Sequence, residues 1–223
     1  MADVALQRKN MVESQVRPSD VTDRRVIRAM LELPREAFVP AVAKAVAYMD
    51  GDVMLSPGGV GKPGRSMMAP RTLARLVQLL EAAPGDRALV VGAGTGYSAA
   101  VLGRMVGKVV AVEPETALSE AAAAAVSAAG SANVTVIKND LVIGAPAEGP
   151  YDVILLDGAV ERVPQALLDQ LAEGGRMVGI VVSGGLGKAM LWRRIGGLVD
   201  GTVMFEAQAP MLPGLQEAMI FAL

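Results

Sequence analysis

The sequence predicts a doubly wound α/β fold with a mostly parallel sheet, an N-terminal helical segment and a C-terminal antiparallel hairpin. Between residues 70 and 182, short continuous runs of Val, Ile and Leu alternate with helical patterns, as in sheets that are covered on both faces. A glycine-dense stretch, Gly92 to Tyr97, separates one such run from the helical pattern that follows it. A strand, a glycine turn and a helix start in this order bring bare backbone close to a ligand.

The N-terminal part, residues 1 to about 50, is expected to be helical. Its clearest helix follows Thr22 or Asp23, either of which can cap it, and ends before Pro34. The apolar residues of this helix recur on one face: Val26, Ile27, Met30 and Leu31. Residues 51–65 are rich in glycine and proline, which favours a loop, either a plain surface connection or a lid beside the glycine stretch.

The elements of the main fold follow from the alternation of apolar runs and helical patterns. We expect strands over residues 88–91, 109–112, 134–137, 152–156 and 177–182, and helices over 73–80, 98–105, 117–129 and 164–172. In the tail, a hairpin is expected from 190–198 and 202–205 around a turn at Asp200-Gly201, and 217–223 could add a strand. We divide the chain into residues 1–69, a helical segment and loop packed on the main domain, and residues 70–223, the main domain.

The composition excludes several classes of function. The chain of 223 residues holds no cysteine and no histidine, so thiolate nucleophiles, cysteine metal sites and Ser-His-Asp catalysis are excluded. The net charge of −2 and the lack of a long basic run argue against a nucleic-acid partner. The N-terminus lacks the apolar core of a secretory signal, and no apolar run is long enough for a membrane span. We therefore expect a cytoplasmic protein with no membrane partner.

The glycine stretch and the strand ends indicate a nucleoside cofactor. A dinucleotide fingerprint would place its last glycine at position 97, which is tyrosine here. The glycines stand at 92, 94 and 96 instead, a spacing that resembles S-adenosylmethionine-dependent methyltransferases. Glu113 ends the second strand, where a carboxylate can hold both ribose hydroxyls. Asp140 follows the third strand, where it can accept from the adenine amino group or orient a neighbouring backbone amide.

The expected cofactor-binding residues are Gly92, Ala93, Gly94, Gly96, Glu113, Asp140 and Leu141. Taken singly, the glycines could form only a tight turn, Glu113 a solvated strand end and Asp140 a turn or helix cap. Their coincidence at the ends of three successive strands favours S-adenosyl-L-methionine as the cofactor and S-adenosyl-L-homocysteine as its product. The sheet is then a Rossmann-like methyltransferase sheet.

Several further motifs resemble the protein-L-isoaspartate O-methyltransferases in order and spacing. They are Leu33-Pro34-Arg35-Glu36-Ala37-Phe38-Val39-Pro40, Ala47-Tyr48, Pro84-Gly85-Asp86-Arg87, Tyr151-Asp152, Val163-Pro164 and Gly174-Gly175-Arg176. The resemblance covers about residues 20–215. It implies an enzyme that methylates the free carboxylate of an isoaspartyl residue in a damaged protein, which begins the repair of that residue. A carboxylate is already ionised near neutral pH, so this reaction needs no general base.

The chain departs from the family's pattern on the acceptor side. Where the family carries a Ser-Gln-Pro segment, with its serine at the reacting centre, this chain has Met68-Ala69-Pro70. Ser66 could replace that serine only if the loop shifts register; otherwise it is a helix cap or a loop serine. Asp157, at the end of the fourth strand, could contact a substrate amine, position a loop or cap a helix. Arg65 is the third substrate candidate, and no catalytic residue is assigned.

Three functions stay open on the sequence alone. The chain could methylate an isoaspartyl protein or peptide, methylate an unidentified small acceptor, or bind the cofactor without turnover. A metal is not expected, because Val181 to Gly185 lacks the further Asp or Asn ligands that metal-dependent small-molecule O-methyltransferases use. The sequence does not predict the oligomeric state.

Overall fold

The computed structural model describes residues 3–59 and 63–216. Its α-helices are α1 (Val4–Met11), α2 (Arg24–Glu32), α3 (Pro70–Leu79), α4 (Tyr97–Gly103), α5 (Thr116–Ala128) and α6 (Gln165–Leu168). Its strands are β1 (Val53–Ser56), β2 (Arg65–Met67), β3 (Arg87–Val91), β4 (Lys108–Val112), β5 (Val134–Ile137), β6 (Tyr151–Val160), β7 (Leu171–Ser183), β8 (Leu186–Ile195) and β9 (Leu198–Glu206). Short 3-10 or π-helical turns are η1 (Val12–Val16), η2 (Arg17–Ser19), η3 (Arg35–Phe38), η4 (Ala41–Val46) and η5 (Pro146–Glu148).

The predicted fold class is confirmed by a central seven-stranded sheet with the order β5-β4-β3-β6-β7-β8-β9. The strands from β5 to β7 pair in parallel, whereas β7, β8 and β9 pair antiparallel as a C-terminal meander. The strand β3 lies between β4 and β6, so the direction of winding reverses at β3. Open α/β sheets bind their ligands beyond the carboxyl ends of the strands at such a reversal.

The strands at the centre of the sheet, β3, β4 and β6, are largely buried on both faces. Ala88 and Val90 of β3 pack into the core that includes α3 and α4, and neither residue is exposed. Leu89 and Val91 point to the opposite face, where they share a core with Leu167 of α6. Because both faces are covered, each strand reads as a continuous apolar run rather than as an alternating one.

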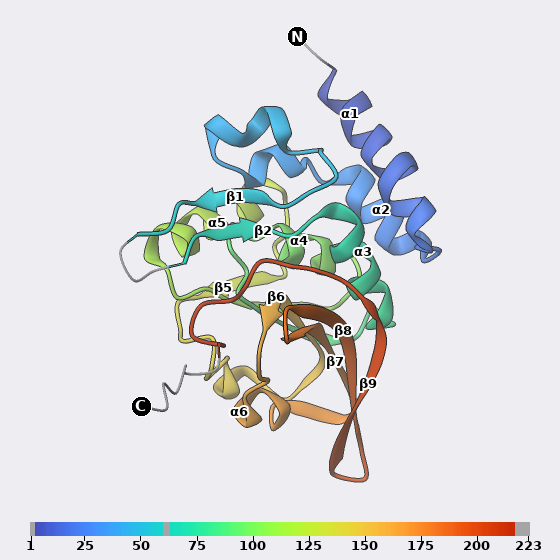
Figure 1. Ribbon diagram of the computed structural model, residues 1–223, viewed down its shortest axis with the longest axis vertical. Helices are drawn as coiled ribbons and strands as arrows, with labels where there is room; N and C mark the ends of the chain where they lie inside the picture. The colour runs from blue at the N-terminus through green and yellow to red at the C-terminus, as the bar shows by residue number, and fades with distance from the viewer. Residues whose placement is uncertain (1–2, 60–62, 217–223) are drawn as a thin grey trace.

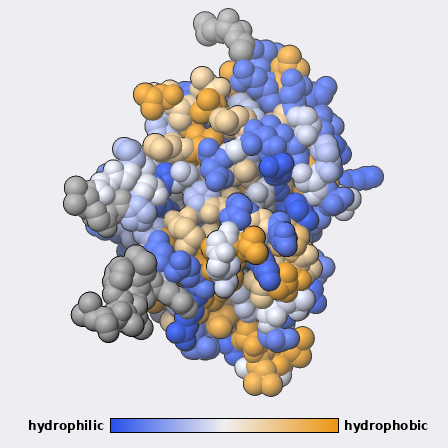
Figure 2. Space-filling view, viewed as in Figure 1, coloured by the Kyte–Doolittle hydropathy of each residue, from blue (hydrophilic) through white to orange (hydrophobic). Residues whose placement is uncertain are grey.

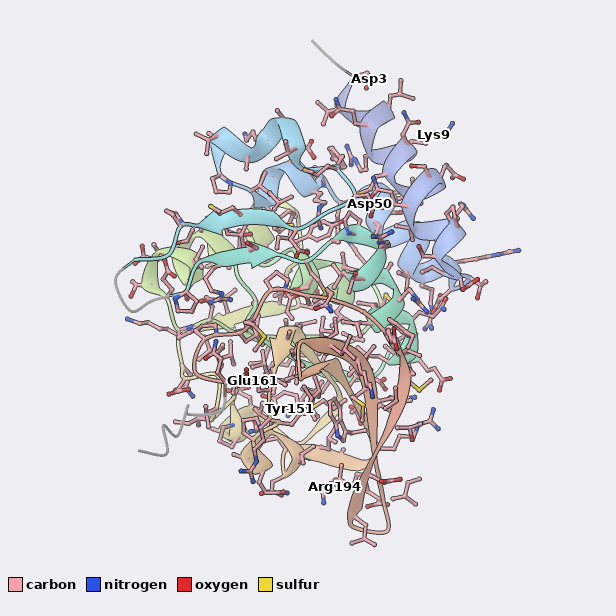
Figure 3. All side chains as sticks on the ribbon, in the orientation of Figure 1. Asp3, Lys9, Asp50, Tyr151, Glu161 and Arg194 are labelled. Carbon is pink, nitrogen blue, oxygen red and sulfur yellow. The ribbon has the colours of Figure 1, made fainter. Side chains whose placement is uncertain are left out.

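The N-terminal helices pack on one side of this sheet, beside α3 and α4, and lie far from the tip of the β8–β9 hairpin (Figure 1). The helix α2 begins after Asp23, whose carboxylate accepts a hydrogen bond from the backbone N–H of Arg25 at 2.8 Å. Asp50, labelled in Figure 3, forms an ion pair with Arg71 at the start of α3, with 3.2 Å between the charged atoms. The division of the chain at residue 69 stays a prediction.

Two predicted elements are wrong. The loop expected over residues 51–65 contains the strand β1 and the first residue of β2, which form a short antiparallel hairpin. The helix expected over 164–172 ends at Leu168, because Gln170 already pairs with the sheet: its carbonyl accepts the N–H of Tyr151 at 2.8 Å.

The C-terminal hairpin is present, but its turn lies elsewhere than predicted. The chain reverses at Gly196-Gly197, which have φ of 61° and 79°, and not at Asp200-Gly201. A Cβ on Gly201 would lie 2.6 Å from Trp192 Nε1, so this glycine permits a close approach within β9. Figure 2 shows apolar residues at the hairpin tip, where Leu198 is 79% exposed. The strand proposed for 217–223 lies outside the described residues.

The burial of β3 makes a testable prediction about stability. We expect Leu89→Ala to lower the free energy of unfolding by about 2–5 kcal/mol, because it leaves a cavity in a fully buried position. Leu198→Ala, the same change at the exposed hairpin tip, should stay within about 0.5 kcal/mol of the unchanged protein. Urea denaturation of the three proteins measures both values. Equal effects of the two substitutions would contradict the position of β3 in the core.

Candidate functional site

The glycine stretch forms a tight turn between β3 and α4. Gly92, Gly94 and Gly96 have φ of 84°, 55° and 92°, in the left-handed region that favours glycine. The backbone N–H groups of Gly92 and Ala93 donate to the carbonyl of Val112 at 2.9 and 3.1 Å. The turn is therefore fixed to the carboxyl end of the neighbouring strand β4.

Glu113 directly follows β4 and is completely buried, so it is not a solvated strand end. Its Oε1 and Oε2 accept hydrogen bonds from Nη1 and Nη2 of Arg65 at 2.6 and 2.9 Å. The same carboxylate accepts the backbone N–H of Gly94 at 2.8 Å and that of Glu115 at 3.2 Å. Arg65 also donates to the carbonyl of Gly92 at 3.1 Å. Glu113 thus joins the glycine turn, the start of α5 and the β1–β2 hairpin.

Asp140 and Leu141 lie after β5 at the same edge of the sheet. The carboxylate of Asp140 accepts the N–H of Val142 at 2.9 Å, so it caps a turn. Asp140 and the buried Leu141 also line a pocket whose walls include Pro114 and Gly214. The turn-capping role and a role in ligand binding are therefore compatible.

The acceptor candidates do not form one cluster. Arg65 pairs with Glu113, as described above, whereas Ser66 is a half-buried residue of β2 opposite Met54. No hydrogen bond of the Ser66 hydroxyl is found among the described residues, and α3 begins only at Pro70. Met68 is 1% exposed, so its side chain belongs to the core.

Asp157 lies within β6 and does not cap a helix. Its carboxylate accepts a hydrogen bond from the hydroxyl of Ser98 in the first turn of α4. Burial raises the pKa of Asp157 to about 6, while the hydrogen bond from Ser98 and the positive charges of Arg65 and Arg35 oppose this rise. Asp157 is therefore an acid whose charge changes close to neutral pH.

Two residues beside the site were not assigned a role from the sequence. Arg35 is completely buried and donates from Nε to the carbonyl of Ala47 and from Nη2 to that of Met68, both at 2.8 Å. Its guanidinium lies 4.9 Å from the ring centre of Tyr97, the first residue of α4. Arg35 stands in the Leu33–Pro40 block that carries the family resemblance, next to a second charged residue, Glu36, so the sequence alone does not show which of the two is buried.

The chemistry of the residues at this edge fits an adenosyl group: a buried carboxylate, a glycine turn and a pocket lined by Asp140 and Leu141. In this conformation, however, Arg65 takes the oxygens of Glu113 that a ribose would need. Within residues 3–59 and 63–216, no group of acidic side chains is arranged to hold a metal ion. The same ranges contain no helix with the length and apolar character needed to cross a membrane.

The raised pKa of Asp157 predicts a pH dependence of stability. Between about pH 4 and pH 6 the folded protein keeps a proton that the unfolded chain has lost, so stability falls as the pH rises through this window. Asp157→Asn removes this loss, so its stability relative to the unchanged protein should rise by up to about 3 kcal/mol from pH 4 to pH 7. Urea denaturation across this range measures the difference.

Ser98→Ala is the matched control, because the Ser98 hydroxyl lowers the pKa of Asp157. We expect the pH range over which stability falls to lie at higher pH in this variant. A constant difference between Asp157→Asn and the unchanged protein from pH 4 to pH 7 would contradict the raised pKa.

Comparisons with known proteins agree with the resemblance seen in the sequence. The family model described as "Protein-L-isoaspartate(D-aspartate) O-methyltransferase (PCMT)" matches residues 6–206. A protein-L-isoaspartate O-methyltransferase of Roseiflexus sp. (strain RS-1) is 42% identical over 176 residues, which are 79% of this chain and 78% of the relative. Its counterpart in Koribacter versatilis is 36% identical over 212 residues, which are 95% of this chain and 93% of the relative.

Solved structures show the same fold. A protein-L-isoaspartate O-methyltransferase structure superposes with a TM-score of 0.82 at 29% identity, covering 94% of this chain and 67% of the other. A Plasmodium falciparum structure, described as a beta-aspartate methyltransferase (PCMT) in complex with S-adenosyl-L-homocysteine, has a TM-score of 0.77 at 21% identity and covers 92% and 97% of the two chains. The family model and the two relatives show that the chain belongs to the protein-L-isoaspartate (D-aspartate) O-methyltransferase family.

Proposed function

We propose that the chain is an S-adenosylmethionine-dependent methyltransferase that methylates the free carboxylate of isoaspartyl residues in proteins or peptides. The observation that carries the proposal is Glu113, a fully buried carboxylate at the end of β4 that is hydrogen-bonded to the glycine turn. A carboxylate at this place suits the hydroxyl pair of a ribose. Membership of the family supports both the methyl donor and the acceptor.

Residues along the carboxyl edge of the sheet would contact three parts of the cofactor. Glu113 would accept from the ribose hydroxyls, and the backbone from Gly92 to Gly94 would lie along the amino-acid part. Asp140 would accept from the adenine amino group, with Leu141 against the ring. When bound, S-adenosylmethionine supplies a methyl group on a positively charged sulfur.

The acceptor chemistry suits a chain without histidine and cysteine. An isoaspartyl carboxylate is ionised near neutral pH, so the protein needs to align it and exclude water rather than remove a proton. Met68 offers no hydroxyl to hold this carboxylate. Arg65, Ser66 and Asp157 are the side chains that we propose for contact with the acceptor.

A small-molecule acceptor is the second candidate function. The observation that favours it is the buried Met68, which stands where the resemblance places a serine at the reacting centre. A cofactor-binding protein without turnover is the third candidate. In each case we place the protein in the cytoplasm, without a nucleic-acid or membrane partner.

The glycine turn gives the first test of the cofactor. We expect Gly94→Leu to weaken the binding of S-adenosylhomocysteine at least about a hundredfold, because a side chain at this positive φ would strain the glycine turn and collide with Leu55, whose Cδ1 lies 2.7 Å from the Cβ position. Gly85→Leu is the control, since a Cβ there meets no atom within 4 Å. Isothermal titration calorimetry measures both affinities. Unchanged binding by Gly94→Leu would show that the cofactor lies elsewhere.

The acceptor is tested by transfer of a labelled methyl group from S-adenosylmethionine. We expect incorporation into a peptide with one isoaspartyl residue and none into the same peptide with an ordinary aspartyl residue. The label on the isoaspartyl peptide should be released by mild base, because it is a methyl ester. Cofactor binding without incorporation would contradict the acceptor and leave the two other candidate functions.

A further inference from the structure

The carboxylate of Glu113 has no acceptor position left. Its four hydrogen bonds come from Nη1 and Nη2 of Arg65, at 2.6 and 2.9 Å, and from the N–H groups of Gly94 and Glu115, at 2.8 and 3.2 Å. A carboxylate offers about four lone-pair sites, so this set is complete. A ribose can bind Glu113 only if one of these donors leaves.

Arg65 is the donor that can leave. The N–H groups of Gly94 and Glu115 belong to the turn after β3 and to the residue that precedes α5, so their places are fixed by the backbone of the fold. The guanidinium of Arg65 is at the end of a flexible side chain. Its departure would free one position on each oxygen of Glu113, which is the number that a pair of ribose hydroxyls requires.

The strand that carries Arg65 lies outside the central sheet. It belongs to the two-stranded β1–β2 sheet, which has no hydrogen-bonded strand of the central sheet beside it. A two-stranded hairpin is only marginally stable by itself, so this one depends on the packing of Val53, Leu55 and Met67 against the core. The buried Met67 pairs with the buried Val53 at the inner end of the hairpin, whereas Arg65 lies at the outer end, next to the connection between the strands. The outer end can therefore move while Met67 keeps its place in the core.

The glycine turn is closed by two leucines. A Cβ on Gly94 would lie 2.7 Å from Cδ1 of Leu55, and one on Gly92 would lie 2.4 Å from Cδ2 of Leu212, so both side chains rest on the backbone of the turn. Leu212 belongs to the segment that follows β9 and crosses the carboxyl edge of the sheet (Figure 1). The N–H of Leu212 donates to the carbonyl of Ala159 in β6 at 2.8 Å.

The two ends of the candidate cofactor site thus differ. The pocket at Asp140 and Leu141, proposed for the adenine, is open. The positions at Glu113, Gly92 and Gly94, proposed for the ribose and the amino-acid part, are covered by Arg65, Leu212 and Leu55. A nucleoside could enter at one end of the site but could not be seated at the other.

The geometry points to Arg65 as a latch that closes the ribose position by ion-pairing with Glu113 and so sets the affinity for the cofactor. This inference rests on the proposed function, because it takes Glu113 as the ribose ligand. The latch competes with the ribose for the same oxygens. The apparent dissociation constant is therefore the intrinsic one divided by the fraction of molecules with the latch open.

Arg65→Gln tests the latch. The substitution removes the cation and its two-pronged grip on Glu113, so we expect S-adenosylhomocysteine to bind at least about tenfold more tightly in isothermal titration calorimetry. Arg71→Gln is the matched control, because Arg71 is an exposed arginine that pairs with Asp50 outside this site. It should bind like the unchanged protein.

The outcomes separate the latch from the proposed function. If the unchanged protein binds S-adenosylhomocysteine and Arg65→Gln binds it equally or more weakly, the latch is wrong and the cofactor assignment stands. If neither protein binds it, both the latch and the proposed cofactor are wrong. Tighter binding by Arg65→Gln, with unchanged binding by Arg71→Gln, supports both the latch and the proposed cofactor.

A second measurement is made on the unchanged protein and uses a conservative variant only to assign the signal. In the unchanged protein, the side-chain N–H protons of Arg65 should exchange slowly with water, because the residue is buried and ion-paired. Nitrogen-15 NMR, with the signal assigned by its loss in Arg65→Lys, should show faster exchange after saturation with S-adenosylhomocysteine. Protection that persists at saturation would overturn the latch.

Discussion

The structure of the site depends on the burial of one carboxylate, that of Glu113. A buried carboxylate costs several kcal/mol unless it is paired and hydrogen-bonded, so the fold must supply its partners, and a partner that leaves must be replaced by another donor. Three of these partners come from separate segments: the glycine turn, the residue before α5 and the hairpin that carries Arg65. Glu113 therefore fixes the relative positions of segments that no single helix or strand connects.

A second buried charge fixes the N-terminal layer in the same way. Arg35 is fully buried, and it joins the carbonyls of Ala47 and Met68 to the ring of Tyr97. The hydroxyl of Thr95, within the glycine turn, donates to the carbonyl of Phe38. The N-terminal block and the turn are thus held together by hydrogen bonds. A shift of the block would therefore displace the start of α4.

The sequence predicts those features of the fold and site that depend on residues close together in the chain. The strands β3, β4 and β5 read as short Val-rich runs because both faces of the sheet are covered, and the glycine turn is visible because three residues need positive φ. Glu113 could be found as well, since it ends a strand. Its pairing with Arg65 could not, because the two residues are 48 positions apart and meet only through the hairpin.

Two of the wrong predictions have a shared physical cause. The pattern predicts a turn at Gly201, but this residue is a glycine because Trp192 of β8 lies directly opposite it, while the turn forms at Gly196-Gly197. The end of α6 was placed too late, because nothing local shows that Gln170 pairs with Tyr151. In both places the residue is chosen by a neighbour on another strand, which a pattern along one segment does not contain.

The charges around the site also explain how a carboxylate acceptor could be tolerated. Glu113 and Asp157 are two acids near two arginines, Arg65 and Arg35, and each of the other three charges influences the pKa of Asp157. With Asp157 ionised and Arg65 paired with Glu113, this group of four is electrically balanced. On the inference drawn above, Arg65 leaves Glu113 when the ribose binds, and the guanidinium then lacks a negative partner. A negative acceptor could pair with Arg65, whereas a neutral acceptor would leave this cation unpaired beside a buried site, where an unpaired charge costs most. The released arginine therefore favours an anionic acceptor over a neutral one, even though Met68 supplies no hydroxyl to hold it.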